Sequence, residues 1–167
     1  MPRRLEWFEA VARGLVKLPK TPPTTPPASQ PPAPPPAHPF DLRNIHPGLP
    51  PKVKKLFDDG HFAEATFEAC KYLDRYVSKH SKISDSGYKL MMAAFDRNNP
   101  KLQLTPLVTQ SEKDEQEGYR FVFAGGVWAI RNPRGHEFSV VDDPDTCLDH
   151  LSFVSMLLRR LEQANFK

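Results

Sequence analysis

The chain has 167 residues, enough for one ordinary domain with an appendage. Its net charge is +3, but residues 44–167 carry 17 Lys or Arg and 17 Asp or Glu residues, which cancel. This excludes a domain that binds nucleic acid through a broad positive field and leaves only a focused patch. No apolar run reaches the roughly 18 residues of a membrane span, and Glu6 and Glu9 do not fit a signal peptide. We therefore expect a cytoplasmic protein without a membrane span.

The first 43 residues differ in composition from the rest. Residues 1–18 carry apolar side chains at helical spacing: Trp7, Phe8, Val11, Leu15 and Leu18. They predict a short amphipathic helix that either docks to a partner or an anionic surface, or packs on its own domain. Residues 19–43 follow, and 14 of the 19 prolines lie between Pro19 and Pro51. Because Pro cannot donate to helix or sheet ladders, we expect a polyproline II linker there, with an SH3-type ligand as the alternative.

Residues 44–167 have the pattern of successive amphipathic helices. Apolar residues recur every three to four positions between helix-ending residues, which predicts helices over 51–60, 61–79, 87–95 and 111–131, and a last one from Pro144. We expect a capping box at Ser111-Glu112-Lys113-Asp114 to open the fourth helix. Strand signals are sparse, and Phe138–Val141 is the best candidate. The expected fold is all-α, an up-and-down bundle of four to five helices.

One short motif carries candidate chemistry: Arg131-Asn132-Pro133-Arg134-Gly135-His136. Pro133 disfavours helical geometry at Asn132, so we expect the helix to break or tighten there and to let Arg131 and His136 meet. A guanidinium offers a planar fork to phosphate oxygens, and an imidazole moves protons near neutral pH. Such a set can act on an RNA phosphodiester without a metal. The alternative is a helix C-terminus whose Arg and His offset the helix dipole.

The motif resembles that of the HEPN ribonuclease superfamily, in which an Arg, often followed by Asn, precedes a His at a helix junction of a small bundle. The wider sequence, over residues 46–162, resembles an uncharacterised prokaryotic family within it, the hypothetical Ymh family. The matching stretches are His46-Pro47, Gly60-His61-Phe62 with Ala65, Glu68-Ala69 with Lys71, Leu90-Met91 with Ala94-Phe95, Gln116-Glu117-Gly118, and Ala129-Ile130-Arg131-Asn132-Pro133 with His136.

The resemblance implies a metal-independent endoribonuclease that leaves a 2′,3′-cyclic phosphate. It also implies a HEPN-like homodimer with two motifs across a composite cleft, and a toxin or antiphage-defence role with RNA, an antitoxin or a defence-system protein as partners. Arg131 and His136 are then catalytic. In related toxins a Tyr two residues after the His can be modified, but this chain has Phe138 there. The alternatives are a non-catalytic HEPN module for nucleotide or RNA binding or dimerisation, and an adaptor that works through its N-terminal helix.

Supporting roles are assigned around this pair. Asn132 and Glu68 are expected to support catalysis, and Arg134 and Trp128 to bind substrate. Glu68 also fits a solvated helix face, and Trp128 fits the core or a dimer seam that Gly125 and Gly126 would bring close. His61 fits a surface or capping position. We expect no metal and no cofactor, because the histidines lack ligand spacing, and we expect the thiols of Cys70 and Cys147 to be buried.

Overall fold

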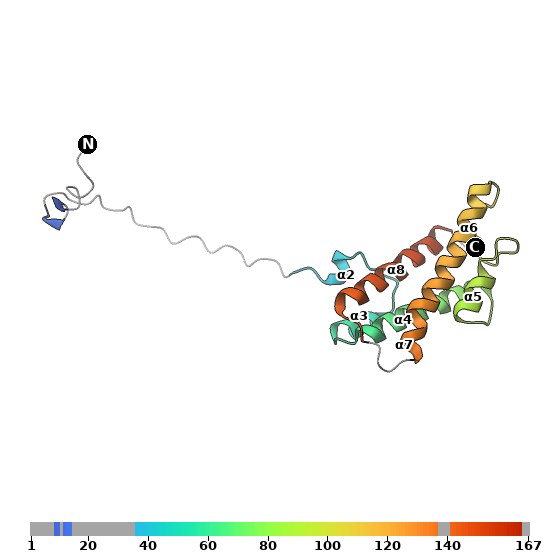
Figure 1. Cartoon of the computed structure of the whole chain (residues 1–167), viewed down its shortest axis with the longest axis horizontal. Coiled ribbons are helices and arrows are strands. Elements are labelled where there is room, and N and C mark those ends of the chain that lie inside the picture. The colour runs from blue at the N-terminus through green and yellow to red at the C-terminus, as the bar shows by residue number, and fades with distance from the viewer. Residues whose placement is uncertain (1–8, 11, 15–35, 137–140, 165–167) are drawn as a thin grey trace. The chain divides into compact units, whose positions relative to one another are not determined.

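The computed structural model describes residues 9, 10, 12–14, 36–136 and 141–164, and the chain divides into two units, Met1–Pro36 and Ala37–Lys167. The second unit is helical throughout the elements that the structure describes (Figure 1). Its elements are α2 (Pro39–Leu42), α3 (Pro51–Asp58), α4 (Phe62–Ser81), α5 (Gly87–Ala94), α6 (Gln110–Gly126), the π-helical turn η1 (Val127–Arg131), α7 (Asn132–His136) and α8 (Pro144–Gln163). The predicted all-α bundle is confirmed.

Two predicted segments are barely covered. Most of the N-terminal helix and of the Pro-rich linker lies outside the described residues, and so does the strand candidate except for Val141. No helix in the described part of the chain is both long and apolar enough to cross a membrane.

The folded unit begins earlier than the predicted boundary at Asn44. The short helix α2 directs Phe40 onto Phe57 of α3, with ring centroids 5.2 Å apart. His38 caps α2 by accepting the Phe40 amide hydrogen on Nδ1, and its Nε2 lies 2.7 Å from the Asp58 carboxylate. Because these contacts tie 38–42 to α3, this stretch belongs to the bundle and not to the linker.

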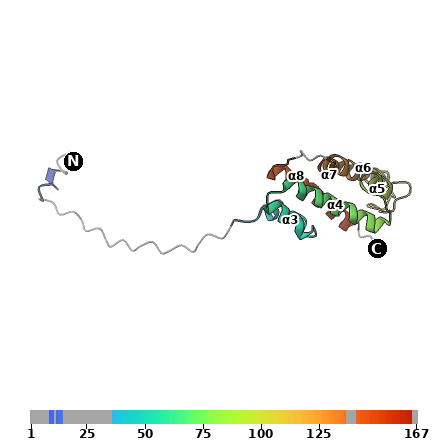
Figure 2. The ribbon, with the colours of Figure 1, turned by 90° about the horizontal axis from the view of Figure 1, so that it is seen from below.

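Helix α4 is the centre of the bundle. It contacts α3, α5, η1, α7 and α8, and Figure 2 shows α3 on one side of it and α6 and α7 on the other. Its buried positions repeat at three-to-four spacing, as the sequence predicts. The helix ends at Ser81, and its C-cap residue, Lys82, has the αL conformation with φ of 58°. The thiols of Cys70 on α4 and Cys147 on α8 are buried and free, as expected.

Helix α6 begins slightly before its predicted start. The capping box is formed by Thr109 and Glu112, not by Ser111 and Asp114: Thr109 Oγ1 accepts the Glu112 amide, and the Glu112 carboxylate accepts the Thr109 amide at 2.9 Å. The fully buried Gln116 then anchors the preceding loop by accepting the Leu104 amide and donating to the carbonyls of Phe95 and Leu102. The start of α6 is therefore fixed relative to α5.

The helix does not break at Pro133, which corrects the prediction. Instead α6 widens into the π turn η1 and continues as α7, with Asn132 at φ −63° and ψ −46°. In a regular α-helix the Pro133 ring would collide with the carbonyl four residues earlier and leave it without a donor. A π turn adds a residue to the helical repeat and so accommodates the proline, and such turns are frequent at functional sites.

Candidate functional site

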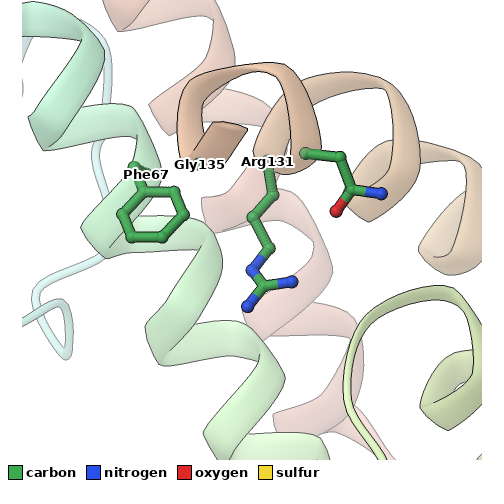
Figure 3. A pocket seen from close by; sticks show the side chains of 4 residues that line it. Phe67, Arg131 and Gly135 are labelled. Carbon is green, nitrogen blue, oxygen red and sulfur yellow. The ribbon is translucent and has the colours of Figure 1, made fainter. Parts of the chain in front are cut away.

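Arg131 is the last residue of η1, and its side chain lies between helices. Figure 3 shows Arg131 extending toward α4, where Phe67 faces it. The guanidinium carbon lies 5.7 Å from the centre of the Phe67 ring, within the range of a cation–π contact. Arg131 makes no hydrogen bond or ion pair with another described residue, and its Nε is buried without a partner. Among the described residues, therefore, none neutralises the charge of this arginine by direct pairing.

A cavity of about 160 Å³ opens beside this guanidinium (Figure 3). It is lined by Phe67, Arg131, Asn132 and Gly135. Gly135 is required for this arrangement, because a Cβ at that position would lie 2.9 Å from Phe67 Cε2. The structure thus brings together three members of the predicted motif around one polar cavity.

Asp74 is the acidic group that sequence reasoning missed. It lies on α4, is only 6% exposed, and accepts the Gly87 amide hydrogen on both carboxylate oxygens, at 2.9 and 3.2 Å. Burial raises the pKa of Asp74, while the Gly87 amide and the positive charge of Arg131 act in the opposite direction. Its position within the apolar repeat of Ala69, Leu73 and Val77 is the sequence signal that could have found it, since a buried carboxylate needs partners.

Gly87 completes this corner of the site. Its φ is +63°, and a Cβ there would lie 3.5 Å from Arg131 Nη1. A side chain at this position would be strained by the positive φ, although its Cβ would meet Arg131 Nη1 at an ordinary contact distance. Gly87 therefore lets the start of α5 approach both Asp74 and Arg131.

Glu68 does not orient Arg131, which corrects its predicted supporting role. Its carboxylate lies 3.2 Å from Lys52 on α3 and 3.3 Å from Lys71 on its own helix. It joins α3 to α4 through these pairs and makes no hydrogen bond or ion pair with Arg131. The alternative that Glu68 lies on a solvated helix face agrees better with the structure, because both ion pairs are partly exposed.

Arg134 is engaged within the fold and is not free for a substrate. Its Nε and Nη2 donate to the two carboxylate oxygens of Asp142, at 2.7 and 2.6 Å, and Nη1 donates to the Ile130 carbonyl at 2.7 Å. The side chains of Arg134 and Asp142 are 9% and 5% exposed. This bidentate pair fastens α7 to the segment before α8, a structural role in place of the predicted substrate contact.

His150 of α8 lies next to this pair. Its Nδ1 is 4.0 Å from Asp142 Oδ2 and has no hydrogen-bond partner in the described part of the chain. Burial and the positive charge of Arg134 lower the pKa of His150. A neutral imidazole therefore packs against the ion pair.

His136 ends α7, one turn beyond Asn132. Its side chain lies outside the described part of the structure, so its approach to Arg131 stays a prediction. His61, by contrast, is exposed at the start of α4, makes no capping hydrogen bond, and lines no cavity with Arg131.

Trp128 lies on the surface and not in the core, because 61% of it is exposed. It packs against Tyr88 of α5, with ring centroids 5.0 Å apart and an angle of 57° between the rings. Trp128 precedes Arg131 by one helical turn. The substrate-binding and dimer-seam roles of Trp128 both stay predictions, whereas the alternative that it lies in the core is wrong.

Thiol and metal chemistry find little support near Arg131. Burial raises the pKa of the Cys70 thiol to about 12, which keeps it protonated and poorly nucleophilic at neutral pH. Within the described ranges no group of three His, Cys, Asp or Glu residues is placed to hold a metal ion.

The comparisons with known proteins give a family without an assigned activity. Residues 43–161 match the family model described as "Protein of unknown function (Hypoth_ymh)". The match covers well over half of the chain, so the protein belongs to the Hypoth_Ymh family. No curated protein and no solved structure matches it. The link to the HEPN superfamily stays a prediction from the motif.

We expect Arg134→Ala to lower the free energy of unfolding by about 3 kcal/mol, because it leaves the buried Asp142 carboxylate unpaired. Asp142→Ala should have a similar effect, and the double variant should lose less than the sum of the two. Urea denaturation measures all three. Arg97→Ala is the matched control, since its pair with Asp114 is exposed and 3.8 Å long, and it should change stability little.

A stable Arg134→Ala variant that binds RNA weakly would contradict this assignment and restore the substrate-binding role.

Proposed function

We propose that the protein is a metal-independent endoribonuclease of the HEPN type. The observation that carries this proposal is the state of Arg131: a guanidinium fixed by Phe67 at the wall of a cavity, without a hydrogen-bonded or ion-paired partner among the described residues. An arginine placed in this way has donors to offer an incoming anion, and the geometry of its planar fork matches the oxygens of a phosphate. Arg134 of the same motif differs from Arg131, because its Nε and Nη2 already donate hydrogen bonds to Asp142.

The chemistry of RNA transesterification fits this set. The 2′-oxygen attacks phosphorus, the bond from phosphorus to the 5′-oxygen breaks, and the products are a 2′,3′-cyclic phosphate and a 5′-hydroxyl. His136 would take the proton of the 2′-hydroxyl or give one to the leaving 5′-oxygen. Arg131 would stabilise the negative charge that develops on the non-bridging oxygens. Asn132, which lines the same cavity, adds an amide donor and acceptor beside Arg131.

The exposed aromatic pair supports a single-stranded substrate. Trp128 and Tyr88 are both exposed and lie next to the cavity-forming helix turn. Bases of an unpaired strand stack on such side chains without strong sequence preference. This chemistry would serve an effector that cleaves RNA in a toxin or antiphage system, which is the role that the resemblance implies.

We expect the purified full chain to cleave single-stranded RNA in the presence of EDTA. Arg131→Ala and His136→Ala should each reduce the rate, roughly 10²–10⁴-fold for the loss of acid–base catalysis at His136. A gel assay with mapping of the cyclic phosphate ends gives the result, and circular dichroism checks the fold. His61→Ala is the control, because that histidine is exposed and outside the cavity.

Activity that needs added Mg²⁺ and persists in His136→Ala would overturn the proposed mechanism. RNA binding without cleavage in the wild type would instead favour the alternative, a non-catalytic module that binds RNA or nucleotide through Arg131 and the aromatic pair.

We further propose that the chain acts as a homodimer formed through the outer face of α6. Phe121 is 55% exposed, and Val122, Gly125 and Trp128 are exposed on the same side of the continuous helix. Nothing lies within 4 Å of a Cβ built on Gly125, so this face is open to a second copy. Gly126 does not contribute, contrary to expectation: it is packed against the Phe153 ring, where a Cβ would collide. One Arg and one His are a small catalytic set, and a two-fold axis beside this face would double it.

Light scattering on the full chain at tens of micromolar tests the dimer, with twice the monomer mass as the expected result. Phe121→Asp should give a monomer and lower the cleavage rate, because it places a charge in the apolar contact. Val108→Asp is the matched control, since Val108 is also an exposed apolar residue, 76% exposed, but lies in the loop before α6. A wild type that is monomeric and fully active would rule out the composite site.

A further inference from the structure

A second cavity adjoins the first across Arg131. It measures about 290 Å³ and lies between one face of α4 and the loop 84–86 that leads into α5. Its cationic lining is Lys71 and Arg75 from α4 together with Arg131 from η1. Because Arg131 lines both cavities, a ligand bound at one can continue into the other.

The positive groups of this second cavity have few competing partners. Arg75 is exposed and makes no hydrogen bond or ion pair with any residue that the structure describes. Lys71 has a single carboxylate within reach, that of Glu68 at 3.3 Å. Arg131 has a buried Nε without a partner. Three cations therefore converge on one cavity while most of their donors stay available.

The start of α5 adds to the positive electrostatic potential of the cavity. Its N-cap, Ser86, makes no side-chain hydrogen bond to the helix and lines the cavity. The first-turn amides of a helix attract anions, and a free N-cap hydroxyl adds a donor. The loop is held in position by Ser78, whose hydroxyl donates to the Ile83 carbonyl at 2.6 Å. The cavity wall is thus fixed by α4 itself.

Two carboxylates oppose an anion here, and their geometry limits their effect. Asp74 is almost fully buried, and both of its oxygens accept the Gly87 amide hydrogen. Asp85 is exposed in the loop, where solvent screens its charge. Among the residues that line the cavity, three cations therefore face two carboxylates, and of these two only Asp85 is exposed.

We propose that this second cavity binds the phosphate next to the scissile one in a single RNA strand. The inference rests on the proposed function, in which Arg131 holds the scissile phosphate at the first cavity. Arg75 and Lys71 then hold the neighbouring phosphate beside the start of α5. The volume is about ten times that of one water molecule in the liquid, which leaves room for a phosphate and part of its ribose. The site would make cleavage depend on strand length, because a substrate with one phosphate cannot fill it.

The first test uses inorganic phosphate alone and needs no RNA chemistry. It is titrated into the ¹⁵N-labelled full chain at constant ionic strength, and the amide signals of Ser86 to Lys89 are followed. We expect saturable shifts that weaken at least about fivefold in Arg75→Gln, as the loss of a charge-assisted contact requires. Lys79→Gln is the matched control, because Lys79 is the next exposed cation one turn along α4 and does not line the cavity. Shifts that do not saturate, or that weaken equally in both variants, would overturn the phosphate site.

The second test compares 2′-O-methyl oligonucleotides, which bind without being cleaved. A trinucleotide with two phosphates should bind about tenfold more tightly than a dinucleotide with one, and this ratio should fall toward unity in Arg75→Gln but not in Lys79→Gln. An unchanged ratio in Arg75→Gln would show that the second phosphate binds elsewhere. If the wild type binds no RNA but the phosphate titration saturates, the proposed ribonuclease function fails and the anion site stands.

Discussion

Pro133 cannot donate a backbone hydrogen bond, and its ring collides with the preceding turn of a regular α-helix. The chain meets this constraint by widening one turn, Val127–Arg131, and continuing as helix to His136. The wide turn brings Arg131 against α4 and the start of α5, and it places Arg134 one turn further on. The positions of the motif residues, and the cavity that Arg131, Asn132 and Gly135 line, follow from this one local distortion.

The two arginines of the motif differ in role: one stabilises the fold, and the other is available to a ligand. Arg134 is paired with Asp142 through two short hydrogen bonds and holds α7 in place. Arg131 is held against the Phe67 ring, which does not take up its charge. The positive charge of Arg131 acts to lower the pKa of Asp74, but the Asp74 carboxylate accepts its hydrogen bond from the Gly87 backbone amide. An uncompensated cation costs stability unless an anion binds it, which is the physical basis for proposing a phosphate ligand.

The sequence predicts the helices well because spacing and end residues are local signals. It also predicts that Arg131 and Asn132 share a corner of the bundle, since they are adjacent at a proline. It does not predict the partners of Glu68 or Arg134, because these depend on which face of α4 meets η1 and on the return of the chain at Asp142. The sequence does not predict the π turn, because a proline in a helix usually indicates an end. Nor does it single out Asp74, because a lone carboxylate in an apolar repeat carries no local signal of the backbone amide that it accepts.

In the proposed function, Arg131 is the group that receives an RNA phosphate. The most direct measurement follows the Nε–H signal of Arg131 by NMR while a non-cleavable 2′-O-methyl RNA is added to the full chain. We expect this signal to shift and to exchange more slowly with water, because a buried donor without a partner among the described residues gains one. The Nε–H of Arg134, already bonded to Asp142, should stay unchanged. A bound RNA that perturbs other signals and leaves the Arg131 Nε–H untouched would show that Arg131 does not hold the phosphate.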